Sequence, residues 1–239
     1  MDPRHLFVDE RLKGVCVYCG AHPDTVDHVP SRVFLDDPLP PNLPTVDACF
    51  SCNQKVSLDE EYLACLVECV LSGTVDPGVI QREKVKRALA RNPRLANRLN
   101  CSKKTDGSCG PIWEPEDERV RNVVLKLAQG HAAYELSLPL LGDPERILVV
   151  PLPAMSESQR IDFEKEPSSQ VQAWPEIGSR AFLQAVVLCA PPNQDQEVFF
   201  DDGWQVIQPE RYRYKVSQTG PTSVSFVLSE YLACLVEWS

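Results

Sequence analysis

The sequence lacks the long apolar runs that mark a membrane protein. Its 239 residues contain no uninterrupted stretch of apolar side chains long enough to span a bilayer, which takes about 18 or more residues. The first residues, Met-Asp-Pro-Arg-His-Leu-Phe, also lack the basic start and apolar stretch of a secretory signal peptide. We therefore expect a soluble, cytoplasmic protein with no membrane partner.

Positive charge is scarce as well. Lys and Arg number 24 against 34 Asp and Glu, a formal net charge of −10, whereas contacts to nucleic-acid phosphates need basic side chains. Residues 82–104 are the exception, with nine basic residues against Glu83, a net charge of +8 that leaves −18 on the rest. Such a segment can contact nucleic acid locally, or it can be the solvated face of a helix. The basic residues are Arg82, Lys84, Lys86, Arg87, Arg91, Arg94, Arg98, Lys103 and Lys104.

Cysteine, by contrast, is abundant, with ten residues. In a long chain in a reducing compartment, paired Cys-x-x-Cys motifs favour a metal site over a disulfide framework. Two such pairs, Cys16 with Cys19 and Cys49 with Cys52, are separated by 29 residues. Each pair places two sulfurs on one tight turn, so two pairs complete a closed tetrahedral zinc site. The other six cysteines lie mostly in apolar runs, where a free cysteine behaves as a small hydrophobic residue.

The segment around these pairs holds residues suited to phosphodiester chemistry. His28, in Asp27-His-Val-Pro, has a side chain that can deprotonate water for attack on phosphorus. The adjacent Asp27 can bind Mg²⁺ or a similar hard cation. Asn53, directly after Cys52, can supply a second oxygen ligand from another element. Asn42 is suited to hydrogen-bonding the backbone and fixing the loop that aims the histidine.

The order Cys-x-x-Cys, Asp-His-Val-Pro, Asn-Leu, Cys-x-x-Cys-Asn resembles the HNH endonucleases of the zinc-stapled type over residues 14–73. The resemblance implies a ββα-metal fold with the four cysteines on a structural Zn²⁺. It implies His28 as the general base, Asp27 and Asn53 as ligands of a catalytic Mg²⁺ or Mn²⁺, and Asn42 as the orienting asparagine. The implied reaction is metal-dependent hydrolysis of phosphodiester bonds, with DNA as the expected substrate.

Two functions stay open at this point. The first is the HNH endonuclease, which the intact set of Asp27, His28 and Asn53 favours. The second is a non-catalytic zinc-binding module that contacts nucleic acid or a protein partner through residues 82–104. The module has only Lys55 as a basic residue directly after its motif, which argues against tight DNA binding by the module alone. By analogy, the acidic body fits a regulated effector such as one in defence against foreign DNA.

Periodicity and turn residues predict an α+β protein in three parts. Residues 1–75 form the ββα-metal zinc module, 76–112 a helical basic connector, and 113–239 a C-terminal domain with a long helix on an antiparallel sheet, where a ligand or partner would bind. Helices are expected at about 59–73, 79–92, 93–99, 114–136 and 156–166, with a loop over 101–113. Strands are expected at 147–152, 182–189, 198–206, 212–216 and 222–228.

One octapeptide occurs twice. Glu61-Tyr-Leu-Ala-Cys-Leu-Val-Glu68 is repeated letter for letter as 230–237, with unrelated flanks, which excludes a repeat architecture. The first copy is predicted to be helical, with Ser57 as its N-cap and Gly73 as its stop. The second follows a β-rich tract, and we expect a strand there because tertiary context overrides local propensity.

Overall fold

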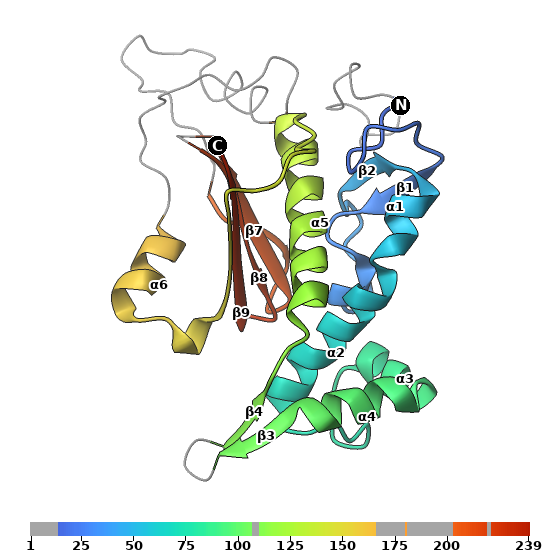
Figure 1. Ribbon diagram of the computed structural model, residues 1–239, viewed down its shortest axis with the longest axis vertical. Coiled ribbons are helices and arrows are strands. Elements are labelled where there is room, and N and C mark those ends of the chain that lie inside the picture. Colours follow the sequence, from blue (N-terminus) through green and yellow to red (C-terminus); the bar gives the residue numbers. More distant parts are fainter. Residues whose placement is uncertain (1–13, 107–109, 166–179, 181–202, 219–220) are drawn as a thin grey trace.

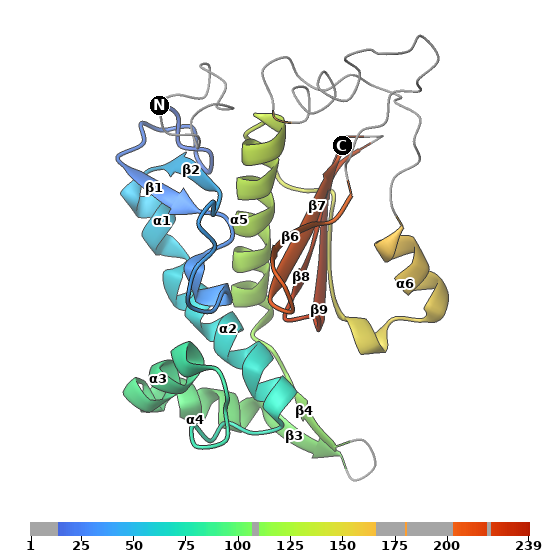
Figure 2. The same cartoon turned by 180° about the vertical axis from the view of Figure 1, so that it is seen from behind.

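Helices dominate the first half of the chain and an antiparallel sheet the second. The structure is a computed structural model that describes residues 14–106, 110–165, 180, 203–218 and 221–239. Its mixture of helices and antiparallel sheets confirms the α+β class (Figures 1 and 2). None of the helices in these ranges is long and apolar enough to cross a membrane.

The chain begins with a hairpin followed by a long, bent helical segment. Strands β1 (Thr25–His28) and β2 (Thr45–Ala48) pair antiparallel, with a short 3-10 helix, η3 (Arg32–Phe34), in the connection. Helix α1 (Phe50–Lys55) starts two residues after β2, and α2 (Ser57–Ser72) follows after Val56. Residues 14–72 therefore place a two-stranded hairpin beside a helix, as a ββα arrangement would.

The end of α2 agrees with the prediction from the sequence, but its start does not. Ser57 is the first helical residue rather than the N-cap, and its hydroxyl donates to the Gln54 carbonyl 2.9 Å away. The prediction of a Ser57 cap was wrong because α1 precedes α2 almost without a break. Ser57 therefore already lies inside the helical segment, and its hydroxyl bonds back to a carbonyl of α1. Gly73 does end the helix, in the left-handed conformation with φ of 68°, which glycine adopts without a steric penalty.

The middle of the chain contains a hairpin that was not expected. Helices α3 (Glu83–Arg91) and α4 (Pro93–Ser102) lead into β3 (Lys103–Asp106), which pairs with β4 (Gly110–Trp113). The prediction of a loop over 101–113 was therefore wrong. Both strands are short and β3 is polar, and their anchor is the buried Trp113 ring, with the Lys103 ammonium 5.1 Å from its centroid. Such a tertiary contact leaves no local pattern in the sequence.

The described residues of the second half form one five-stranded antiparallel sheet in the order β5-β9-β8-β7-β6. The strands β8 and β9 are joined by a turn in which Ser229 and Glu230 have φ of 51° and 46°. This is the primed turn geometry that matches the twist of a hairpin. The strand expected at 182–189, and most of that expected at 198–206, lie outside the described residues. The observed strands are β5 (Arg146–Pro151), β6 (Gln205–Gln208), β7 (Tyr212–Ser217), β8 (Thr222–Leu228) and β9 (Leu232–Trp238).

Helix α5 (Asp117–Leu136) stands between the sheet and the N-terminal hairpin and helices, whereas α6 (Glu157–Glu164) lies on the other side of the sheet (Figures 1 and 2). One hydrophobic cluster runs from Tyr62 in α2 through Val124 in α5 to Phe226 in β8. The helical half and the sheet therefore share a core. A smaller cluster around Phe163 of α6 covers the opposite face of the sheet.

The repeated octapeptide adopts two conformations, as predicted. Its first copy lies inside α2. Its second copy supplies the last two residues of the β8–β9 turn, Glu230 and Tyr231, and most of β9. The same eight letters thus form part of a helix at one place, and part of a turn and an inner strand of the sheet at the other.

Candidate functional site

The four sulfurs of the two Cys-x-x-Cys pairs converge on one point. The Sγ atoms of Cys16, Cys19, Cys49 and Cys52 all lie within 4.8 Å of one another, and those of Cys19 and Cys49 are 3.8 Å apart. Zn–S bonds of about 2.3 Å in a tetrahedron require sulfurs roughly 3.8 Å apart. The donor set therefore fits a metal such as zinc, as the sequence predicts. Within the described residues this is the sole group of three or more His, Cys, Asp or Glu side chains so placed.

Local turns produce this convergence. The amide of Gly20 donates to the Cys16 carbonyl at 2.8 Å, and Gly20 has φ of 76°, so the first pair closes a tight turn. In the second pair, the amide of Cys52 donates to the Cys49 sulfur at 3.4 Å. Burial raises the pKa of the Cys16 and Cys52 thiols, because a thiolate loses solvation there. A divalent cation among the four sulfurs would offset that cost.

The strand β1 directs Asp27 and His28 to opposite faces of the hairpin. Asp27 faces inward and is 6% exposed, opposite the buried Val46 of β2. His28 is half-buried and shares the outer face with Val26, which is 52% exposed. This follows from the two-residue period of a strand. The candidate general base and the candidate metal ligand are thus adjacent in sequence but point apart.

Asn53 lies beside the same strand. It belongs to α1, and its Nδ2 donates to the carbonyl oxygen of Val26 at 3.4 Å. That carbonyl belongs to the peptide group joined to Asp27, so α1 brings Asn53 next to the Asp27–His28 pair. The bond uses the amide nitrogen and leaves Oδ1, the atom that binds cations. Oxygen atoms from Asp27 and Asn53 fit the preference of Mg²⁺ and Mn²⁺ for hard ligands.

The residues that surround the Asp27 carboxylate were not predicted from the sequence. Its Oδ2 lies 2.9 Å from the Tyr18 hydroxyl and 2.9 Å from Nζ of Lys126, a residue of α5. The same ammonium is 2.8 Å from Oε1 of Glu60, which also accepts from the Ser31 hydroxyl at 2.6 Å. Burial alone would lower the pKa of Lys126, but the carboxylates of Glu60 and Asp27 outweigh it and raise that pKa. Lys126 therefore stays charged.

Asn42 lies apart from these contacts. Its side chain is exposed and makes no hydrogen bond to any residue that the structure describes. It lines a groove of about 450 Å³ between the module and the sheet, together with Thr45, Tyr134 and Arg180. The structure therefore does not bring Asn42 into hydrogen-bond contact with the hairpin, and its orienting role stays a prediction.

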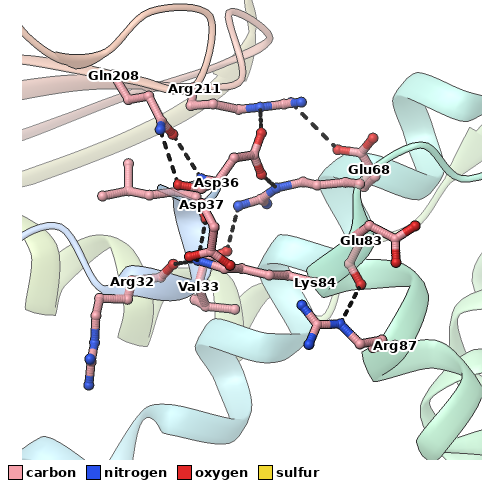
Figure 3. A network of polar contacts seen from close by, with 12 residues as sticks. Arg32, Val33, Asp36, Asp37, Glu68, Glu83, Lys84, Arg87, Gln208 and Arg211 are labelled. Carbon is pink, nitrogen blue, oxygen red and sulfur yellow. Dashed lines mark hydrogen bonds and ion pairs between the residues drawn. The ribbon is translucent and has the colours of Figure 1, made fainter. Parts of the chain in front are cut away.

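A second polar network fixes the loop after η3 to the sheet (Figure 3). Asp36 accepts from the Arg82 guanidinium at 2.6 Å and from Arg211, in the turn before β7, at 2.5 Å. Its backbone amide donates to Gln208 of β6 at 2.8 Å. Although burial opposes the charge on Asp36, the two arginines hold the pKa of that carboxyl below its usual value. The loop that follows the hairpin strand is thus tied to α3 and to the sheet.

Most of the basic stretch 82–104 is neutralised by neighbours. Five of its nine basic residues form ion pairs, and Arg82 is almost fully buried. Lys103 and Arg87 donate to backbone carbonyls instead. Of the nine, only Arg91 and Arg94 are exposed and have no polar partner among the described residues. The five pairs are Arg82–Asp36, Lys84–Asp37, Lys86–Glu83, Arg98–Glu116 and Lys104–Glu114.

No family model, no curated protein and no solved structure matches this chain. Its chemistry has to be inferred from its own residues. These are a cluster of four sulfurs, a strand that carries His28 and Asp27, and the amide of Asn53 beside that strand.

Proposed function

We propose that the chain is a metal-dependent endonuclease of the HNH type that hydrolyses phosphodiester bonds in DNA. The observation that carries the proposal is the hydrogen bond from Asn53 to the Val26 carbonyl. It sets a neutral oxygen donor next to an acid and a histidine, on elements that the four cysteines hold together. A zinc module without catalytic function has no need of that combination.

In this proposal His28 takes the proton from the attacking water. It lies on the outer face of the hairpin, half-exposed, where a nucleic-acid backbone can approach. An imidazole titrates near neutral pH, so it can accept a proton there. Asp27 and Asn53 would hold Mg²⁺ or Mn²⁺, which neutralises charge on the phosphate and the leaving oxygen. The four cysteines would hold Zn²⁺ and take no part in the reaction.

The paired basic stretch makes the non-catalytic alternative less favourable. A module that worked by binding alone would need a broad basic surface, and in residues 82–104 only Arg91 and Arg94 are exposed without a polar partner among the described residues. Two arginines suit an accessory contact to the DNA backbone rather than the main binding surface. Binding without cleavage is therefore an outcome of the test and not a second proposal.

The test is cleavage of supercoiled plasmid by the full chain with Mg²⁺ or Mn²⁺. His28→Ala is expected to abolish cleavage, while His22→Ala, which changes an exposed histidine outside the site, should cleave like the wild type. All three proteins should contain the same amount of zinc. Equal cleavage by His28→Ala, or none by the wild type with either metal, would reject the nuclease.

A further inference from the structure

Lys126 is an unusual residue to find against a candidate catalytic strand. It comes from α5, far along the chain from the hairpin, and it is 5% exposed. Its ammonium lies between two buried carboxylates, 2.9 Å from Asp27 Oδ2 and 2.8 Å from Glu60 Oε1. A buried lysine is rare unless it is fully paired, and here both partners belong to or adjoin the hairpin module.

The contacts to Asp27 all fall on one of its two oxygens. The Tyr18 hydroxyl and the Lys126 ammonium both lie 2.9 Å from Oδ2. Among the described residues, no side chain or backbone amide bonds to Oδ1. The carboxylate is thus held by one oxygen while the other is left to a ligand. Asn53 repeats the pattern, because its nitrogen is held by the Val26 carbonyl and its oxygen is left.

Glu60 completes the arrangement by holding the lysine. Its Oε1 accepts from both Lys126 and the Ser31 hydroxyl, at 2.8 and 2.6 Å. Ser31 lies three residues after His28, so Glu60 of α2 links the lysine to the segment that follows the histidine. Carboxylates that bind metals are commonly fixed by hydrogen bonds, as the Asp27 carboxylate is through Oδ2.

We propose that Lys126 and Tyr18 are positioning residues for Asp27, which hold its Oδ2 so that Oδ1 is presented to the divalent metal. The proposal rests on the proposed function, because it assumes that Asp27 is a metal ligand. It adds that the site is incomplete without α5, a helix outside the HNH-like segment 14–73. In this proposal the Lys126 ammonium, which should repel a divalent metal, is needed for that metal to bind.

Two roles of Lys126 predict opposite results. If the ammonium only repels cations, its removal strengthens the binding of a divalent metal. If it orients Asp27, its removal weakens that binding, as loss of an outer hydrogen-bond partner commonly does by 10- to 100-fold. The sign of the change in affinity therefore separates positioning from simple electrostatics.

The experiment is titration of the zinc-loaded full chain with Mn²⁺ in the absence of nucleic acid. Electron paramagnetic resonance of the free ion measures how much Mn²⁺ is bound. Lys126→Met and Tyr18→Phe are each expected to weaken Mn²⁺ binding about tenfold or more. Lys103→Met is the control, because it makes the same substitution at a partly buried lysine that lies in β3 and bonds to the Gly73 carbonyl rather than to Asp27. It should leave the affinity unchanged. Tyr18→Phe removes a single hydroxyl, so it provides the measurement if Lys126→Met fails to fold.

Cleavage assays add a second readout. Both variants should need more Mn²⁺ for half-maximal rate and regain most of the rate at saturating Mn²⁺, while zinc content stays constant. Unchanged or tighter Mn²⁺ binding in both variants, with a wild type that binds Mn²⁺ and cleaves, would overturn the positioning role alone. A wild type that neither binds Mn²⁺ nor cleaves would instead overturn the proposed function.

Discussion

The buried His131 makes the stability of the protein depend on pH in a predictable way. Its ring is fully buried in α5, Nε2 lies 2.7 Å from the Tyr212 hydroxyl, and the ring stacks on Tyr214 at 3.8 Å between centroids. Nδ1 has no partner among the described residues. Its stacking partner Tyr214 donates from its hydroxyl to the charged Glu135, which pairs with Arg180. Burial lowers the pKa of His131 to about 3.

The sign and size of the effect follow from linkage. In the unfolded chain the histidine pKa is about 6.5, so below that pH the unfolded state binds a proton that the folded state excludes. The stability contributed by neutral His131 is complete above about pH 6.5 and falls as the pH falls toward 3. At pH 5 the loss is about 2 kcal/mol in the free energy of unfolding, at roughly 1.4 kcal/mol per pH unit. The loss of about 2 kcal/mol at pH 5 is nearly the same for any pKa of His131 in the folded state below about 4.

Urea unfolding at about pH 8 and pH 5, with excess zinc and followed by circular dichroism, measures the loss. His131→Gln keeps an amide able to bond Tyr212 but does not titrate, so it should lose about 2 kcal/mol less than the wild type between the two pH values. His22→Gln changes an exposed histidine and should follow the wild type. Zinc release in acid affects all three proteins alike. Equal losses in wild type and His131→Gln would refute the reasoning.

Three shorter predictions concern other elements. Cys52→Ser, or a strong chelator, should remove about one zinc per chain and lower the melting temperature; mass spectrometry that finds full zinc in the variant would contradict the four-sulfur site. Asp36→Ala should cost about 2 kcal/mol in urea unfolding, because it leaves the buried Arg82 guanidinium with only the Val33 carbonyl; a cost below about 0.5 kcal/mol would argue against the network. Ser229→Asn should raise the unfolding free energy by about 0.5 kcal/mol, because asparagine tolerates the left-handed conformation; a lower melting temperature would count against a strained turn.

Features encoded locally could be predicted from the sequence. The cysteine spacing predicted a four-sulfur cluster, and the structure brings those sulfurs together. Gly73 ended α2 where expected, and the amphipathic pattern before Leu136 marked α5. In each case the determining contact lies within a few residues or on one helix face, so that spacing alone carries the information.

Features set by distant partners could not be predicted. Lys126 is separated from Asp27 by most of the helical half, and nothing in its own surroundings marks it as a partner of that carboxylate. The hairpin β3–β4 depends on burial of Trp113, and five of the nine basic residues in 82–104 are paired with acidic residues such as Asp36 and Glu116. The repeated octapeptide shows the same limit directly, because identical letters form a helix within 61–68 and a strand within 230–237.

Helix α5 gives the C-terminal half a physical route to the candidate site. Toward the hairpin it presents Lys126, bonded to Asp27. Toward the sheet it presents His131, bonded to Tyr212, and Glu135, bonded to Tyr214. These three side chains lie within three helical turns, so a shift of α5 against the sheet would also move the ammonium that holds Asp27. If Asp27 binds a metal as proposed, a ligand or partner that binds the C-terminal sheet and favours one position of the helix would therefore alter that binding without contacting the hairpin.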